Sequence, residues 1–152
     1  MSIVEVVISI AVIVTVGIAS TAVWSSYIKT TRSSGGLAQG GMLTDEAGEA
    51  LTLLRDQSWK ANIAPLTLGS TYYIYWNGTS YSTSTTAVAV QSNYYVKFVL
   101  SAVGRDASSN IVASGGTNDP NTLKATLTVV NVNSSTTPIA QSEALLHNVY
   151  SN

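Results

Sequence analysis

The sequence predicts an α+β protein, in which a long N-terminal α-helix packs on an antiparallel sheet of about four strands. Residues 6–24 form an uncharged apolar run, and apolar residues then recur every three or four positions as far as residue 60. Beyond that point, alternating apolar and polar residues are separated by Gly, Pro, Asn and Asp, as is typical of strands and turns. The chain therefore divides into a hydrophobic helix (1–28), its amphipathic continuation (29–60) and a β-sheet head (61–152).

Composition excludes several classes of function. The 152 residues carry seven Lys and Arg against eight Asp and Glu, so the charge does not indicate a nucleic-acid partner. There is no cysteine, which rules out disulfides, thiolate metal sites and a thiol nucleophile. His147 is the single histidine, and a multi-histidine metal site within one chain is therefore impossible.

The apolar run is long enough to cross about 30 Å of hydrocarbon as a helix. Trp24 and Tyr27 lie where an interfacial aromatic belt would place them. A continuous helix of about 58 residues would measure about 87 Å, far more than a small domain, so we expect its hydrophobic half to project from the sheet.

Two simple interpretations of this run fit poorly. A cleavable signal peptide needs a basic region first, whereas residues 1–5 carry only an acid, Glu5. In a plain membrane anchor, Lys29 and Arg32 would keep the head in the cytoplasm, although its Ser, Thr, Asn and Tyr content is typical of extracellular domains. A basic leader removed before Met1 would resolve that conflict.

Glu5 is the residue that sets the segment apart. An acid in the middle of a membrane helix costs about 2.5–3.5 kcal/mol, less near an end, and is by default a functional hypothesis. The alternative is that Glu5 lies among headgroups and complements the positive end of the helix dipole.

Residues 1–25, beginning MSIVEVVISIAVIVTVGIAS, resemble the mature N-terminus of type IV pilins and the related pseudopilins, with Glu5 at the family's acidic position. The resemblance implies a basic leader ending in Gly, its removal by a prepilin peptidase, and methylation of the new N-terminal amine on Met1. It implies assembly through pairing of Glu5 with the amine of an adjoining subunit. Small residues such as Gly17 would let helices approach closely. The filament-core helix would include Val6, Ile8, Ile10, Ile13, Val16 and Trp24.

Three departures from the family pattern accompany this resemblance. Met1 stands where Phe is more usual, no proline occurs before Pro65, and the common C-terminal disulfide is missing. Gly17 or Gly35-Gly36 would be weaker substitutes for the proline at which the helix melts in the filament. In the head, YYVKF, RDASSN, DPNTLKATLTVV and the terminal Asn152 are more loosely similar to minor pilins and pseudopilins.

The expected function is that of a structural subunit in a helical filament of identical chains. It would stand in the cytoplasmic membrane before assembly and in an extracellular pilus afterwards, with the prepilin peptidase and the pilus assembly machinery as partners. A minor pilin or a type II secretion pseudopilin is the alternative, and a membrane-anchored extracellular binding domain or enzyme is a third interpretation. Adhesion, motility, DNA uptake and secretion all stay open as roles.

The amphipathic continuation is expected to place one stripe of side chains on the sheet. That stripe comprises Leu43, Ala47, Ala50, Leu51, Leu54 and Trp59, with Asp45, Glu46, Glu49 and Arg55 outward. Gly35-Gly36 and Gly40-Gly41 interrupt it, so either the helix loosens there or its backbone approaches a neighbour closely.

The strands follow in order. Residues 71–76 precede Asn77-Gly78, which predicts a hairpin with a type I′ turn, and 79–86 is a loop or a frayed returning strand. Residues 93–103 and 122–132 alternate, whereas 105–110 and 115–121 are turn-rich. Segment 139–150 is ambiguous between strand and short helix. The inward residues are expected to be Tyr94, Val96, Phe98, Leu100, Leu123, Ala125, Leu127 and Val129.

No catalytic motif for a hydrolase, nucleotide-binding loop or zinc protease occurs, so we expect neither an enzyme nor a cofactor. Asp106-x-Ser108-x-Asn110 imitates the start of a calcium loop but lacks its glycine and closing acid, which makes Asp106 and Asn110 weak candidates. Asn77 and Asn133 begin glycosylation-type triplets. We expect His147, and the aromatic residues Tyr72, Tyr73, Tyr75 and Trp76, to serve packing rather than chemistry.

Overall fold

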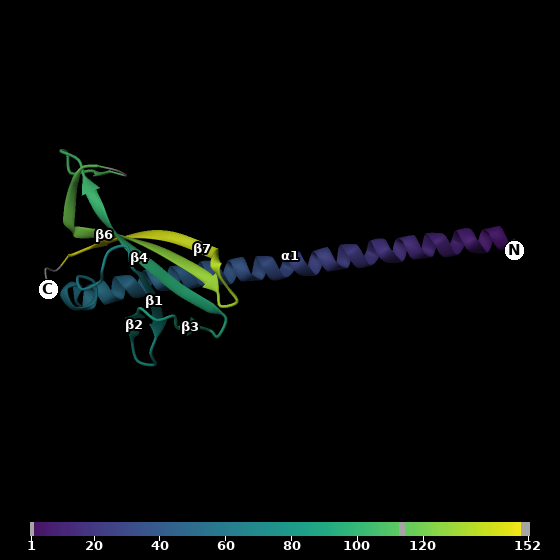
Figure 1. Cartoon of the computed structure of the whole chain (residues 1–152), viewed down its shortest axis with the longest axis horizontal. Helices are drawn as coiled ribbons and strands as arrows, with labels where there is room; N and C mark the ends of the chain where they lie inside the picture. Colours follow the sequence, from purple (N-terminus) through teal and green to yellow (C-terminus); the bar gives the residue numbers. More distant parts are fainter. Residues whose placement is uncertain (1, 113–114, 150–152) are drawn as a thin grey trace. The chain divides into compact units, whose positions relative to one another are not determined.

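The computed structural model describes residues 2–112 and 115–149, and its architecture is the predicted α+β one (Figure 1). Helix α1 runs over Ile3–Gln57, 55 residues, and its second half packs on an antiparallel sheet. The chain forms two compact units, Met1–Ala38 and Gln39–Asn152, and each is described by itself below.

The helical region ends in two steps rather than running unbroken to residue 60. Ser58 adopts an extended conformation, φ −170° and ψ 112°, which ends α1 at Gln57. The Ser58 Oγ then accepts a hydrogen bond from the Ala61 amide at 3.2 Å and caps the short helix α2, Trp59–Asn62. Trp59, which was expected to continue the stripe of the long helix, is buried but belongs to α2.

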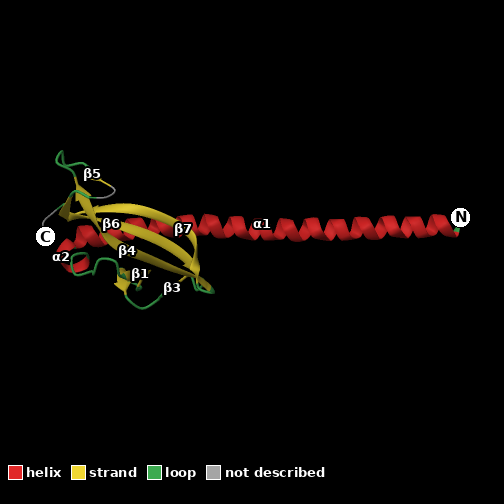
Figure 2. Cartoon of the chain, turned by 45° about the horizontal axis from the view of Figure 1, so that its top comes forward, coloured by secondary structure: helices red, strands yellow, loops and turns green. Residues whose placement is uncertain are grey.

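The sheet has five main strands in the order β2-β1-β4-β6-β7, all antiparallel to their neighbours (Figure 2). These are β1 Thr71–Trp76, β2 Tyr81–Ser84, β4 Tyr94–Arg105, β6 Thr117–Asn131 and β7 Ser134–His147. The two-residue strands β3 Ala89–Val90 and β5 Ile111–Val112 both pair with β4. Since β6 occupies one edge of β4 along its length, β3, β1 and β5 follow one another along the other edge.

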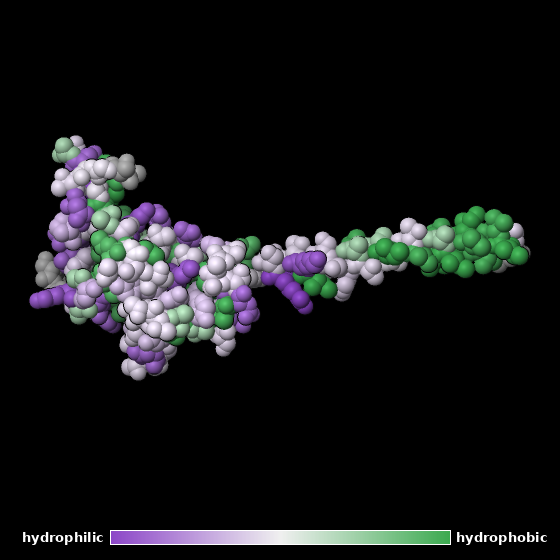
Figure 3. All heavy atoms as spheres, in the orientation of Figure 1, coloured by the Kyte–Doolittle hydropathy of each residue, from purple (hydrophilic) through white to green (hydrophobic). Residues whose placement is uncertain are grey.

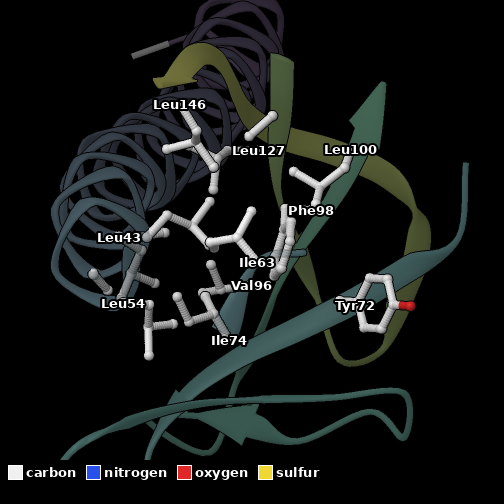
Figure 4. Close-up of a cluster of buried hydrophobic side chains, with 14 of the residues drawn as sticks. Leu43, Leu54, Ile63, Tyr72, Ile74, Val96, Phe98, Leu100, Leu127 and Leu146 are labelled. Atoms are coloured by element: carbon white, nitrogen blue, oxygen red, sulfur yellow. The ribbon is translucent and has the colours of Figure 1, made fainter. Parts of the chain in front are cut away.

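The hydrophobic core lies between the second half of α1 and one face of this sheet (Figure 4). The predicted stripe of α1 is buried, with Leu51 fully inaccessible to solvent. The alternation of β4 and β6 is confirmed, and only Leu123 among the predicted inward residues is half-buried. Phe98, Leu100, Leu127, Val129 and Leu146 are among the largest fully buried side chains of this core, and all five come from the sheet.

Two expectations about the sheet are corrected at the ends of strands. Segment 139–150, ambiguous in sequence, belongs to β7 as far as His147, and β6 begins at Thr117, inside the region expected to be turn. The register between β4 and β6 shifts between Ala102 and Val103, because Pro120, Asn121 and Thr122 have no partner there. That bulge allows β6 to continue past a proline.

The Asn77-Gly78 hairpin is present, but its loop is not a two-residue type I′ turn. Trp76 pairs with Tyr81, which leaves a loop of residues 77–80, and Asn77 does not have the positive φ that a type I′ turn needs. Among the non-glycine residues that the structure describes, two consecutive positive φ values occur instead at Gln91 (51°) and Ser92 (62°), in the turn between β3 and β4.

The glycines of α1 do not break it. A Cβ at Gly40 would lie 2.6 Å from the Ile139 Cγ2 of β7, so Gly40 marks a close approach between helix and sheet. The same atom at Gly35, Gly36 or Gly41 would meet nothing within 4 Å. Of the two explanations for these glycines, close approach holds at Gly40, and the helix is continuous at all of them.

Candidate functional site

The N-terminal part of α1 carries apolar side chains on all its faces, and they are exposed (Figure 3). The predicted filament-core residues illustrate this, since Ile13 is 70% exposed and Trp24 67%. The other four are Val6, Ile8, Ile10 and Val16, all between 41% and 59% exposed. An exposed apolar surface of this extent is typical of a segment that meets lipid or other protein chains.

Among the described residues, α1 is the helix that is long and apolar enough to cross a membrane, judged by length and composition. A signal sequence passes the same test, so this property alone indicates association with a membrane or export.

The hydroxyl groups of the apolar segment donate hydrogen bonds to carbonyl groups of the helix itself. Ser9 donates to the Glu5 carbonyl at 2.8 Å, Thr15 to that of Ala11 at 2.7 Å, and Ser20 to that of Val16 at 2.8 Å. Each hydroxyl proton is thus satisfied one helical turn back, as polar side chains must be in an apolar surrounding. The surface offered to a partner is correspondingly apolar.

Glu5 is the one acid in this segment, and its carboxylate has no hydrogen-bond or ion-pair partner among the described residues. It lies in the first turn of α1, where the positive end of the helix dipole favours a negative charge. Met1, whose amine is the expected partner of Glu5 in another copy, lies outside the described residues. Gly17 faces open space on the helix, since a Cβ at this position would meet nothing within 4 Å.

A groove on one face of the same segment combines small and aromatic residues. Its lining residues recur at helical spacing and are Val16, Ala19, Ser20, Val23, Trp24 and Tyr27. The rings of Trp24 and Tyr27 lie 6.3 Å apart and are both exposed.

In the head, the calcium candidates come together as a turn. Asp106 accepts hydrogen bonds from the Ser108 and Asn110 amides at 2.8 and 2.9 Å and from the Asn110 side chain at 3.2 Å. The backbone and side-chain bonds from Asn110 lower the pKa of Asp106. Asn110 therefore faces Asp106 as a donor, and the described residues contain no group of three or more His, Cys, Asp or Glu placed to hold a metal.

His147 belongs to a polar cluster that the sequence did not reveal. Arg105 Nε donates to Asp119 Oδ2 at 2.6 Å, and the Thr122 hydroxyl donates to the same oxygen at 2.6 Å. Because that hydroxyl proton is used on a carboxylate, His147 Nδ1, 2.8 Å from Thr122 Oγ1, must be the protonated partner. These bonds lower the pKa of Asp119 to about 2, with the Thr122 bond as the first cause and Arg105 as the second.

This cluster holds the end of β7 to the bulge of β6. Beyond His147, the Asn148 amide donates to the Asn121 carbonyl at 2.9 Å. Thr122 is only 1% exposed, so the arrangement offers no nucleophile to a substrate. It ties down the C-terminal strand of a head that has no cysteine. The one sequence signal for it is Asp119-Pro120, a typical turn-initiating pair.

The remaining candidates also take part in packing. Tyr72 is buried and stacks on Phe98, whereas Tyr73 and Tyr75 lie on the other face of the sheet, so the aromatic cluster alternates as expected. Tyr81 donates to Glu46 at 2.8 Å, a hydrogen bond that raises the pKa of the tyrosine.

Searches with this chain against models of protein families, curated proteins and solved structures return no match. The architecture itself, a long apolar N-terminal helix packed on an antiparallel sheet, is consistent with a pilin-like fold.

Proposed function

We propose that this chain is a structural subunit of a type IV pilus, held together by its apolar helices with Glu5 paired to the N-terminal amine of a neighbour. The observation that carries the proposal is the exposed apolar segment interrupted by a single acid without a partner among the described residues. An apolar surface alone would suit any anchor. An acid at its start needs a counter-charge when the surface is covered.

The proposed mechanism has two environments for the same segment. Before assembly the helix stands in the cytoplasmic membrane, after a prepilin peptidase has trimmed and methylated the terminus. During extraction the assembly machinery moves it from lipid into a bundle of like helices, which exchanges one apolar surrounding for another. The Glu5–amine pair then acts as a register device, because most other axial offsets would leave both charges buried without a partner.

The same architecture also fits a minor pilin or a type II secretion pseudopilin, which primes a filament or acts as a piston. The number of subunits in purified fibres separates these roles, since a major pilin forms the dominant band and a primer only a trace. A membrane-anchored binding domain or enzyme would act as a monomer through its head. The head's polar cluster is buried at Thr122, which gives that interpretation little support.

The test is Glu5→Val in the full chain, expressed in cells that contain a pilus assembly system. We expect normal processing and membrane insertion but a loss of filaments of about tenfold or more, because the register pair is worth at least about 1.4 kcal/mol per subunit in specificity. Immunoblots of the sheared-filament and membrane fractions, with electron microscopy, measure both quantities.

Two matched variants accompany it. Glu5→Asp keeps the charge on a shorter side chain and should retain part of the assembly. Glu49→Gln removes an exposed acid from the head portion of the same helix and should leave assembly unchanged. Normal filaments from Glu5→Val, formed at the normal rate, would overturn the register mechanism.

A further inference from the structure

The head contains two triplets of the N-linked glycosylation type, Asn77-Gly78-Thr79 and Asn133-Ser134-Ser135. Nothing in the sequence favours either of them over the other. The structure separates them, because modification requires an accessible carboxamide on a backbone that can enter an enzyme's active site.

Asn77 is fully engaged in the loop between β1 and β2. Its Oδ1 accepts from the Thr79 and Ser80 amides, both at 3.0 Å, and its Nδ2 donates to Ser82 Oγ at 2.8 Å and Ser80 Oγ at 3.3 Å. Its own amide donates to the Ser80 carbonyl at 3.0 Å. Attaching a sugar to Nδ2 replaces one of its two hydrogens and therefore removes one of the two bonds that Nδ2 donates within the loop.

Asn77 and Asn133 are both exposed, and what distinguishes Asn133 is the lack of such side-chain hydrogen bonds among the described residues. Asn133 lies in the two-residue loop between β6 and β7, is exposed, and its side chain makes no hydrogen bond with any described residue. The two residues that complete its triplet, Ser134 and Ser135, are exposed as well.

Three residues that follow soon after Asn133 also lack a partner on β6. Asn131 pairs with Ser134, but the next pair is Val130 with Pro138, so Ser135, Thr136 and Thr137 have no partner on β6. The Ser135 carbonyl accepts a long hydrogen bond from Lys97 Nζ, at 3.4 Å. An exposed extended segment outside the ladder can open at little cost in free energy.

We infer that Asn133 is the N-glycosylation acceptor of this chain and that Asn77 is not. The donor is a glycan carried on a lipid phosphate or pyrophosphate. The Asn133 Nδ2 forms a bond to the sugar C1 and loses one proton, the C1–O bond breaks, and the lipid phosphate leaves with the electron pair. The inference rests on the proposed function only for the export that would bring the head to such a transferase.

The experiment uses the purified full chain in detergent, an oligosaccharyltransferase specific for Asn-x-Ser/Thr, and its lipid-linked glycan. Mass spectrometry of the intact chain and of its peptides counts and locates the added glycans. We expect one glycan on the wild type and on Asn77→Gln, and none on Asn133→Gln or Ser135→Ala. The last variant keeps the asparagine and removes only the Ser135 hydroxyl, which the transferase must recognise.

A synthetic peptide of residues 129–138 serves as the positive control for the enzyme. If the peptide is modified and the folded chain is not, or if the folded chain is modified at Asn77, the inference is wrong. The assay involves no filament, so its result is independent of Glu5. Filaments built from chains unmodified in this assay would leave the pilus proposal intact and overturn this one alone.

Discussion

The two halves of α1 treat apolar side chains and acids in opposite ways. In residues 3–27 the apolar side chains are exposed, with Ile3 at 83%, and Glu5 has no partner among the described residues. In residues 43–54 the apolar side chains lie in the core, with Leu51 at 0%, and Glu46 accepts a hydrogen bond from Tyr81. The first half is apolar on all sides, whereas the second is apolar on one stripe.

The two halves therefore need different surroundings. A one-sided stripe is satisfied by the sheet of its own chain, and its remaining faces suit water. A helix that is apolar all round is stable only when lipid or other helices surround it. The second half of α1 thus buries its apolar stripe within its own chain. The apolar surface of the N-terminal half has to be covered by lipid or by other helices.

Shortening one buried and one exposed side chain should affect stability very differently. Leu51→Ala should lower the free energy of unfolding of the head by about 3–4 kcal/mol, because it leaves a cavity in a packed core. Ile13→Ala should leave that free energy unchanged, since Ile13 is 70% exposed. Urea unfolding of the full chain in detergent, followed through the buried Trp59, gives both values. Equal losses for the two variants would contradict the comparison.

A smaller effect tests the close approach of helix and sheet. Gly40→Ala would place a methyl 2.6 Å from Ile139 Cγ2 and 3.3 Å from Ala140 Cβ. The repacking should outweigh the gain in helix propensity and cost a net amount of about 1 kcal/mol. Gly41→Ala meets nothing within 4 Å and should instead stabilise the helix by up to about 1 kcal/mol. The same unfolding measurement compares them, and a gain in both variants would show that the sheet yields at Gly40.

The size of the side chains that face the helix explains which strands could be predicted from the sequence. Strands β4 and β6 face the helix with large apolar residues such as Phe98 and Leu127, so their alternation is plain in the sequence. Strand β7 faces it mainly with Ala140, Ser142 and Ala144, paired with inward residues of β6. Because these inward residues are small or polar, the two faces of the strand differ little in hydrophobicity. Segment 139–150 is therefore ambiguous between strand and helix in the sequence.

Side-chain hydrogen bonds account for what else the sequence did not reveal. Asn77-Gly78 suits a type I′ turn, but the Asn77 side chain caps two amides and fixes a longer loop. Arg105, Asp119 and Thr122 are brought together by a bulge, and apart from the turn-initiating pair Asp119-Pro120 no local pattern in the sequence indicates that register shift. The N-terminal segment, by contrast, is predictable because its character is local, a run without charge after one acid.

The smallest expected effect concerns Asp119 of the head, which has an ion-pair and a hydrogen-bond partner, whereas Glu5 has none among the described residues. The folded pKa of Asp119 is about 2, below its ordinary 3.8, so the ionised form is favoured in the folded state. Its stabilisation is therefore present above the ordinary value and is lost as the pH falls towards the folded value. Asp119→Asn should be less stable than the wild type at neutral pH, and the difference should shrink between pH 3.8 and about 2.

Thr122→Val tests the cause of that shift while keeping the shape of the buried side chain. The Thr122 hydroxyl is the first contributor to the low pKa of Asp119, so its removal should raise that pKa. The acid-induced loss of stability should then begin at a higher pH than in the wild type. Unfolding free energies measured across the acidic range separate the two variants. If Thr122→Val keeps the wild-type profile, the charge of Arg105 rather than the hydroxyl holds Asp119 ionised, and the tie between β6 and β7 is mainly electrostatic.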